Sequence, residues 1–138
     1  MLRGALLLLA AASVASCGNA SPVAETKTPG PREVGVLTIE PQALATRLEA
    51  GEAIQLIDVR SAEEFAEGHI AGAINLPVDV FDPAKLPDAG GADLFLYCRS
   101  DRRSGIAAER LAEAKNATAV HMEGGILAWE EAGLPVKQ

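Results

Sequence analysis

Residues 94–111, LFLYCRSDRRSGIAAERL, decide how this chain folds. Residues 94–97 form a short apolar run typical of a buried strand, and the apolar spacing after Ser104 is typical of a helix. Cys98 stands where the strand ends. A strand that turns into a helix predicts one unit of a mainly parallel α/β sheet, because parallel strands need such a crossover.

The same alternation continues on both sides of this stretch. Short apolar runs predict further strands over residues 54–59, 73–76 and 119–122. Helix signals predict helices over residues 41–50, 61–66, 104–114 and 125–132, with Ile106, Ala107 and Leu111 on the inner face of the third helix. Ser61 and Glu64 have the spacing of a capping box. A chain of 138 residues with 49% apolar residues forms one such domain.

Residues 98–104 form the candidate active-site loop. Ligands of parallel sheets bind beyond the carboxyl ends of the strands, where this loop lies. Turn N–H groups, the positive end of the helix dipole and Arg99, Arg102 and Arg103 favour a thiolate at Cys98, against one acidic residue, Asp101. A thiolate in such a cradle can attack an anionic sulfur donor. The alternative is a structural cysteine beside solubilising arginines.

Three blocks in this order, LIDVRSAEEFAEGHIAGAINLP, LFLYCRSDRRS and EGGILAWEEAGLPV, resemble a rhodanese domain over about residues 38–136. The resemblance implies the rhodanese/Cdc25-like α/β fold, a five-stranded, mainly parallel sheet with helices on both faces. It also implies that Cys98 is catalytic: it accepts a sulfane sulfur, commonly from thiosulfate, and passes it from a persulfide to a thiol or to cyanide. The expected substrate-binding residues are Arg60, Arg99, Ser100, Asp101, Arg102, Arg103 and Ser104.

The resemblance also implies supporting roles outside the loop. Asp58 is expected to order the neighbouring loop and Arg60 to line the pocket; a purely structural ion pair is the alternative. His69 is expected to be a hydrogen-bonded structural residue. Asp101 departs from the family, whose loops often have glycine there. Aspartate tolerates the left-handed conformation, but its charge bears on which donor is preferred. Gly124 and Gly125 could let backbone approach the site closely.

Three other functions share parts of this pattern. A phosphatase or arsenate reductase of the same fold uses a Cys-x5-Arg loop, but the sixth residue after Cys98 is Ser104, not arginine. Non-catalytic rhodanese modules commonly lack the active cysteine. A thiol oxidoreductase needs a resolving cysteine, and the only other cysteine of the chain is Cys17. Two histidines without spaced ligands give no metal signature, and no cofactor is expected.

The beginning of the chain predicts export. Arg3, a short apolar run and small residues resemble a bacterial signal peptide over residues 1–16, and the residues before Cys17 resemble a lipobox. Cys17 is then lipidated, residues 17–33 are a flexible tether and residues 34–138 the domain. The alternatives are an ordinary cleaved signal or an N-terminal helix.

These signals also indicate where the protein works and what it meets. One exported domain of this kind is similar to the periplasmic phage-shock rhodaneses. We expect a bacterial cell-envelope protein, facing the periplasm or the exterior, attached to the membrane only by lipid. Its partners are a small anionic sulfur donor and a thiol acceptor, either a small molecule or a protein. A net charge of −7 argues against nucleic-acid binding.

Overall fold

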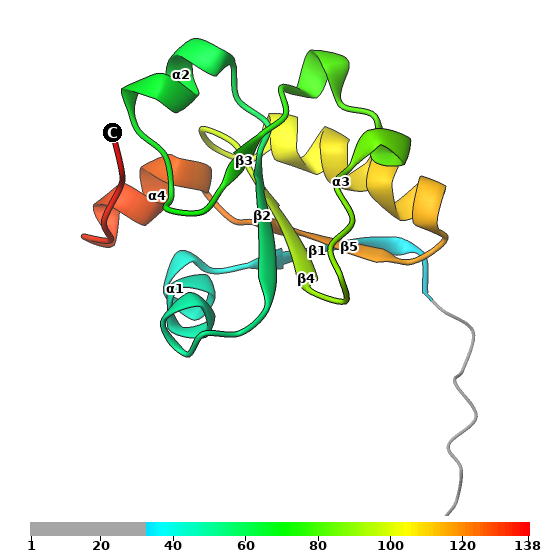
Figure 1. Cartoon of the computed structure of the whole chain (residues 1–138), viewed down its shortest axis with the longest axis horizontal. Helices are drawn as coiled ribbons and strands as arrows, with labels where there is room; N and C mark the ends of the chain where they lie inside the picture. Colours follow the sequence, from blue (N-terminus) through cyan, green and yellow to red (C-terminus); the bar gives the residue numbers. More distant parts are fainter. Residues whose placement is uncertain (1–32) are drawn as a thin grey trace, which may run out of the picture.

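The computed structural model describes residues 33–138. The predicted signal peptide and Cys17 therefore lie outside the described residues. Strands and helices alternate along this part of the chain (Figure 1). The strands are β1 Gly35–Ile39, β2 Ile54–Asp58, β3 Ile74–Asn75, β4 Asp93–Tyr97 and β5 Thr118–Met122. The helices are α1 Pro41–Glu49, α2 Ala62–Glu67, α3 Arg102–Lys115 and α4 Gly125–Glu131, with two 3-10 turns at Val78–Val80 and Pro83–Lys85.

The five strands form one parallel sheet in the order β1-β5-β4-β2-β3. Helix α3 covers one face, and α1 and α4 cover the other (Figure 1). The expected α/β fold, a five-stranded parallel sheet with helices on both faces, is confirmed. This order puts β4 in the middle of the sheet, so the residue that follows it emerges at the centre of the carboxyl edge.

Alternation along β4 divides its side chains between the two faces. Phe95 and Tyr97 pack with α1 and α4, whereas Leu96 and Cys98 pack with α3. The strand is buried on both sides, which explains its continuous apolar sequence. The cysteine is consequently turned toward α3.

The edge strand β1 and the position of Ile106 differ from the sequence-based prediction. The apolar runs predicted four strands, and β1 is a fifth that they did not identify; it is an edge strand in which Leu37 is 61% exposed. The prediction that Ile106 lies on the inner face of α3 is wrong. Its side chain is 36% exposed, and Ala107, Ala108 and Leu111 form the buried stripe.

The ends of the helices follow local sequence rules. The capping box of α2 is present, because the Ser61 hydroxyl accepts from Glu64 N–H and the Glu64 carboxylate accepts from Ser61 N–H. Gly133, two residues after α4, has φ +71°. In the described part of the chain, no helix is long and apolar enough to cross a bilayer.

Candidate active site

The loop from Cys98 to Asp101 joins the central strand β4 to α3 and holds the thiol inside the protein. Cys98 is 1% exposed. Helix α3 begins at Arg102, two residues earlier than predicted, so its unpaired N–H groups lie next to the loop. The thiol is therefore at a strand end and beside a helix N-terminus, as the sequence predicted.

Behind the thiol lies a short chain of hydrogen bonds. Cys98 Sγ is 3.4 Å from Ser104 Oγ, which lies 3.0 Å from His121 Nδ1 and 3.0 Å from the carbonyl oxygen of Asp101. Ser104 and His121 are both buried. Burial lowers the pKa of His121, although the nearby carboxylates of Asp101 and Glu123 oppose this shift.

Sequence reasoning missed His121 as part of this site. The signal that could have found it is alternation in β5: Ala119 and His121 share one side of the strand, facing α3 and the thiol, whereas Met122 faces α1 and α4. A polar ring at an inward position of a buried strand needs a hydrogen-bond partner, and Ser104 is that partner.

Helix α4 docks directly on the loop backbone. Ile126 N–H donates to Cys98 O at 2.9 Å, and Leu127 N–H donates to Arg99 O at 3.2 Å. Gly125 has φ +59°, and a Cβ there would lie 2.4 Å from Ser100 O and 2.5 Å from Cys98 O. The expectation that a glycine lets backbone approach the site is confirmed at Gly125.

Asp101 connects the loop to the turn before α4. Its backbone has φ −126° and ψ −36°, so the turn does not need the left-handed conformation that aspartate tolerates. The carboxylate accepts a hydrogen bond from Gly124 N–H at 2.8 Å. An acceptor side chain at this position therefore holds two loops together, which glycine could not do.

The three loop arginines have different surroundings. Arg103 forms two hydrogen bonds to Glu64, at 2.6 and 2.8 Å, and these lower the pKa of Glu64 to about 2. Arg99 and Arg102 make no ion pair within residues 33–138. Two cationic groups are thus available to an anion near the loop, and the third holds α2 against α3.

Two hollows flank the loop. The first, about 360 Å³, lies on the α3 side, and its lining includes Arg102, Arg103, Arg110 and Asp79, so it is predominantly basic. The second, about 250 Å³, lies on the α4 side. Its polar lining is mixed in charge and consists of Arg60, Arg99, Glu64, Glu67, Glu130 and Gln138.

Asp58 and Arg60 form a closed ion pair at the end of β2. Arg60 Nε lies 3.0 Å from both carboxylate oxygens of Asp58, and Arg60 Nη2 donates to Asp58 Oδ2 at 2.7 Å and to Gly68 O at 2.6 Å. Both side chains are buried. These contacts favour the alternative interpretation, a structural ion pair. Arg60 also lines the second hollow, beside Arg99.

The contacts of His69 are with Phe65 and Lys137, not with the loop that carries Cys98. Its Nδ1 lies 3.0 Å from Phe65 O, and its ring stacks on Phe65 at 3.8 Å between centroids. Its backbone pairs with Lys137. These contacts are those of a residue that fixes the segment after α2. Within residues 33–138, no cluster of three histidine, cysteine or acidic side chains could hold a metal ion.

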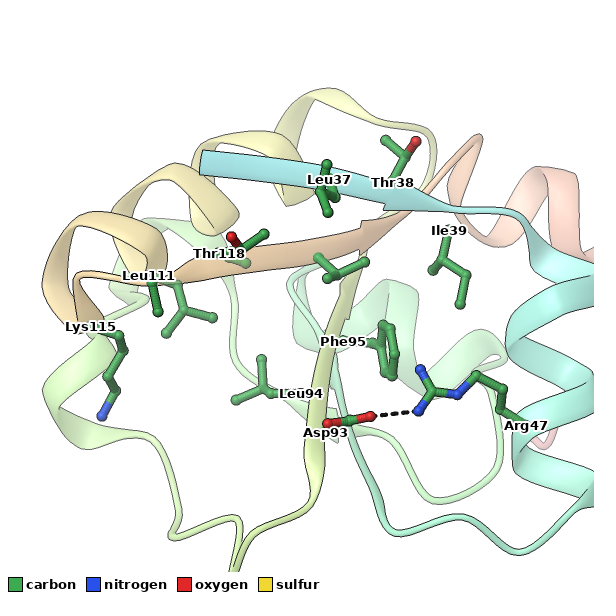
Figure 2. A pocket seen from close by; sticks show the side chains of 13 residues that line it. Leu37, Thr38, Ile39, Arg47, Asp93, Leu94, Phe95, Leu111, Lys115 and Thr118 are labelled. Atoms are coloured by element: carbon green, nitrogen blue, oxygen red, sulfur yellow. Dashed lines mark hydrogen bonds and ion pairs between the residues drawn. The ribbon is translucent and has the colours of Figure 1, made fainter. Parts of the chain in front are cut away.

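A larger pocket, about 530 Å³, contains no residue of the loop. It lies toward the amino ends of β4 and β5, where Asp93 and Thr118 begin these strands. Figure 2 shows Arg47 of α1 paired with Asp93 at one side of it, with Leu94 and Phe95 near the pair and Leu37 on the opposite side. Because the loop lies at the opposite edge of the sheet, this pocket has no connection with Cys98.

Comparisons with known proteins identify the family of this domain. The family model of the rhodanese-like domain matches residues 40–132. An uncharacterized protein of Synechocystis is 43% identical over 99 residues, which are 72% of this chain and 55% of that protein. A sulfurtransferase of Allochromatium vinosum is 33% identical over 98 residues, which cover 71% of this chain and 92% of the relative. This chain therefore spans about half of the first relative and nearly all of the second.

A solved structure gives the same result for the fold. The crystal structure of a rhodanese-related protein from Thermoplasma volcanium matches with a TM-score of 0.63 and 30% identity. The match covers 72% of this chain and 96% of that chain.

Proposed function

Since this chain belongs to the rhodanese-like domain family, we propose that it is a sulfurtransferase that carries sulfur on Cys98. The donor is a small anion with a sulfane sulfur, such as thiosulfate, and the acceptor is a thiol or cyanide. The observation that carries the proposal is the position of the thiol. Cys98 follows the central strand, beside the N-terminus of α3, in a loop whose carbonyls are already engaged by α4.

The transfer runs in two balanced steps. The Cys98 thiolate attacks the sulfane sulfur of thiosulfate, a Cys98 S–S bond forms, and sulfite leaves with the electron pair of the broken S–S bond. The acceptor thiolate then attacks the outer sulfur of the Cys98 persulfide. A new persulfide leaves on the acceptor, and Cys98 returns as a thiolate, so no external oxidant or reductant is needed.

The charges of the loop support an anionic donor. Arg99 and Arg102 make no ion pair within the described residues, and the charged lining of the hollow on the α3 side is three arginines against Asp79. Helix dipoles and N–H groups add positive potential at the same place. A dianion is therefore attracted locally by a protein whose net charge is −7.

Intact-mass analysis after incubation with thiosulfate tests the proposal. We expect a gain of one sulfur atom that dithiothreitol removes, and we expect Cys98→Ser to lose both the gain and at least nine-tenths of thiosulfate:cyanide activity. The circular dichroism spectrum of the variant should be unchanged, because the substitution removes little volume. A folded wild-type protein that gains no sulfur from thiosulfate or from a persulfide donor would instead be an interaction module.

We also propose that the protein is exported and anchored by lipid on Cys17. The support is the sequence of residues 1–17, which lies outside the described residues. In a bacterial host, Cys17→Ala should move the protein from the membrane fraction to a soluble or unprocessed form. A wild-type protein that is soluble after export would overturn the anchor and leave the sulfur-transfer proposal untouched.

A further inference from the structure

The Ser104 hydroxyl has three partners and only one proton. Cys98 Sγ lies 3.4 Å away, His121 Nδ1 3.0 Å and Asp101 O 3.0 Å. Asp101 O also accepts from Gly105 N–H at 2.8 Å, so it stays hydrogen-bonded if the hydroxyl turns elsewhere. The hydroxyl can donate to only one partner at a time, and turning it from Asp101 O to the sulfur or the imidazole leaves no carbonyl oxygen unpaired.

The charge of the sulfur decides how this proton is used. A neutral thiol can donate to Ser104 Oγ, and the hydroxyl can then donate to a bare Nδ1 of His121. A sulfur anion, whether thiolate or persulfide, only accepts. If the hydroxyl turns to donate to that anion, a bare Nδ1 loses its hydrogen-bond partner. A buried nitrogen without a partner destabilises this arrangement. An Nδ1–H group instead donates to Ser104 Oγ, and every group is satisfied.

The other ring nitrogen provides a route for the proton. His121 Nε2 makes no hydrogen bond within residues 33–138. Among the fully buried side-chain nitrogen and oxygen atoms of this part of the chain, Gln55 Oε1 alone lacks a partner. Nε2 is therefore in reach of solvent, and the ring can exchange its proton there while Nδ1 stays turned toward Ser104.

We propose that His121 is a positioning residue that, by donating from Nδ1 to Ser104, holds the Ser104 hydroxyl as a hydrogen-bond donor to the anionic sulfur of Cys98. The role of His121 in sulfur transfer rests on the proposed function. Its effect on the ionisation of the Cys98 thiol is independent of that function. A hydrogen bond to a charged acceptor is about twice as strong as one between neutral groups, so the arrangement favours the sulfur anion over the thiol.

The charged groups that act on the ring are consistent with a neutral donor. Asp101, before α3, and Glu123, after β5, are the charges that face His121, and both favour protonation of the ring. Burial opposes them and prevails, which lowers the pKa of His121. What matters for the proposal is that Nδ1 carries a hydrogen, because an Nδ1–H group donates to Ser104 whether or not Nε2 is also protonated.

The rate of Cys98 alkylation by iodoacetamide as a function of pH tests the proposal without any sulfur transfer. His121→Leu removes the donor and should slow alkylation at pH 7 about tenfold, the size of one hydrogen bond to a charged group. His121→Asn keeps an amide donor near the position of Nδ1 and should stay within about threefold of wild type. Equal rates in wild type and a folded His121→Leu variant would overturn the proposal.

A double-mutant cycle tests whether His121 acts through Ser104. Ser104→Ala should slow alkylation by about tenfold as well, and adding His121→Leu to it should change little further. Multiplication of the two effects, to about a hundredfold, would mean that His121 acts by another route and would overturn the proposal.

Nitrogen-15 NMR of the ring covers the case in which a variant fails to fold. At about pH 9.5, where an ordinary cysteine is ionised, the wild-type protein should show His121 protonated on Nδ1, and Cys98→Ala should shift the ring toward Nε2–H. A bare Nδ1 in the wild-type protein at that pH would overturn the proposal. Failure to form a persulfide would refute the proposed function and leave these three measurements unaffected.

Discussion

Two polar clusters lie at the carboxyl ends of neighbouring strands and differ in how completely they are paired. At the end of β2, the Asp58 carboxylate is engaged by the guanidinium and the backbone N–H of Arg60, which also binds Gly68 O. At the end of β4, Cys98 has one partner side chain, Ser104, and two loop arginines have no ion pair within residues 33–138.

The difference distinguishes a structural ion pair, Asp58 with Arg60, from a thiol and two arginines that can still bind a ligand. A buried charge that is fully hydrogen-bonded has nothing left to offer a substrate, and its loss mainly costs stability. A thiol with one weak partner and unpaired cations nearby has capacity for a new anion. Stability should therefore depend on the cluster at the end of β2, and sulfur chemistry on the loop after β4.

The largest effect on stability is expected from Asp58→Ala. Removing the carboxylate leaves the buried Arg60 guanidinium without its counter-ion, which costs about 3–5 kcal/mol of unfolding free energy. Urea denaturation followed by circular dichroism measures it. The double variant Asp58→Ala/Arg60→Met should recover much of this loss, because no charge then remains buried.

The exposed ion pair of Arg47 with Asp93 is the matched control for that prediction. Asp93 is 63% exposed, so Asp93→Asn should cost less than about 1 kcal/mol. A loss of similar size from Asp58→Ala and Asp93→Asn would show that burial does not distinguish the two pairs.

Gly125→Ala is expected to disturb the loop through its backbone. The new Cβ would overlap Cys98 O and Ser100 O, so α4 must move away from them and lengthen the hydrogen bond from Ile126 N–H to Cys98 O. Overpacking and the positive φ together cost about 2–4 kcal/mol, and sulfur transfer should fall with the displaced loop.

Gly133→Ala separates the two causes. Gly133 has φ +71°, but nothing lies within 4 Å of a Cβ there, so only the conformational cost of about 1 kcal/mol applies. Thermal unfolding and the thiosulfate rate of both variants are the measurements. A full thiosulfate rate in Gly125→Ala would contradict the role assigned to the contact between α4 and the loop.

The contrast between the two clusters also explains what could be predicted from the sequence. The loop was predictable because its signals are local: a strand end, a helix start and three arginines lie within six residues of Cys98. The capping box and the glycine after α4 were local as well. Edge strand β1 was missed although Val36, Leu37 and Ile39 are apolar, because so short an apolar run does not by itself establish a strand.

What the sequence could not give depends on contacts between distant segments. His121 lies 17 residues from Ser104 along the chain, and the packing of α3 against β5 brings the two together. The bond from Gly124 N–H to the Asp101 carboxylate joins residues 23 apart. Ile106 was assigned inward because helical spacing fixes a stripe but not which neighbouring residue lies at its edge.

A smaller effect is expected from Glu64, which links α2 to the loop through Arg103. The bond to Arg103 lowers the pKa of Glu64 to about 2 in the folded protein, from 4.5. The folded state thus binds fewer protons, and the contribution of the pair is present above about pH 4.5 and is lost as the pH falls toward 2. For a partly exposed pair, solvent screening limits this contribution to about 1 kcal/mol.

Glu64→Gln should therefore destabilise the protein at pH 7 and have little effect near pH 2.5, measured as a difference in urea midpoint. Glu67→Gln is the control on the same helix, since Glu67 makes no ion pair within the described residues. If both variants show the same dependence on pH, the pair with Arg103 is not its source.

The smallest effect is expected at Asp101, and it tests whether the loop after β4 is tuned by charge as well as by contacts. Asp101→Asn keeps an oxygen acceptor for Gly124 N–H and removes the negative charge. The side chain is exposed, so its repulsion of a thiosulfate dianion is strongly screened. The removal should raise kcat/KM for thiosulfate by about two- to threefold, which corresponds to about 0.5 kcal/mol.

Asp101→Ala removes the charge and the acceptor together, and should lose about 1 kcal/mol of stability as well. A rise in kcat/KM that is equal in both variants, with stability lost only in Asp101→Ala, separates the charge from the contact. An unchanged rate in Asp101→Asn would mean that Asp101 serves the loop only by binding Gly124.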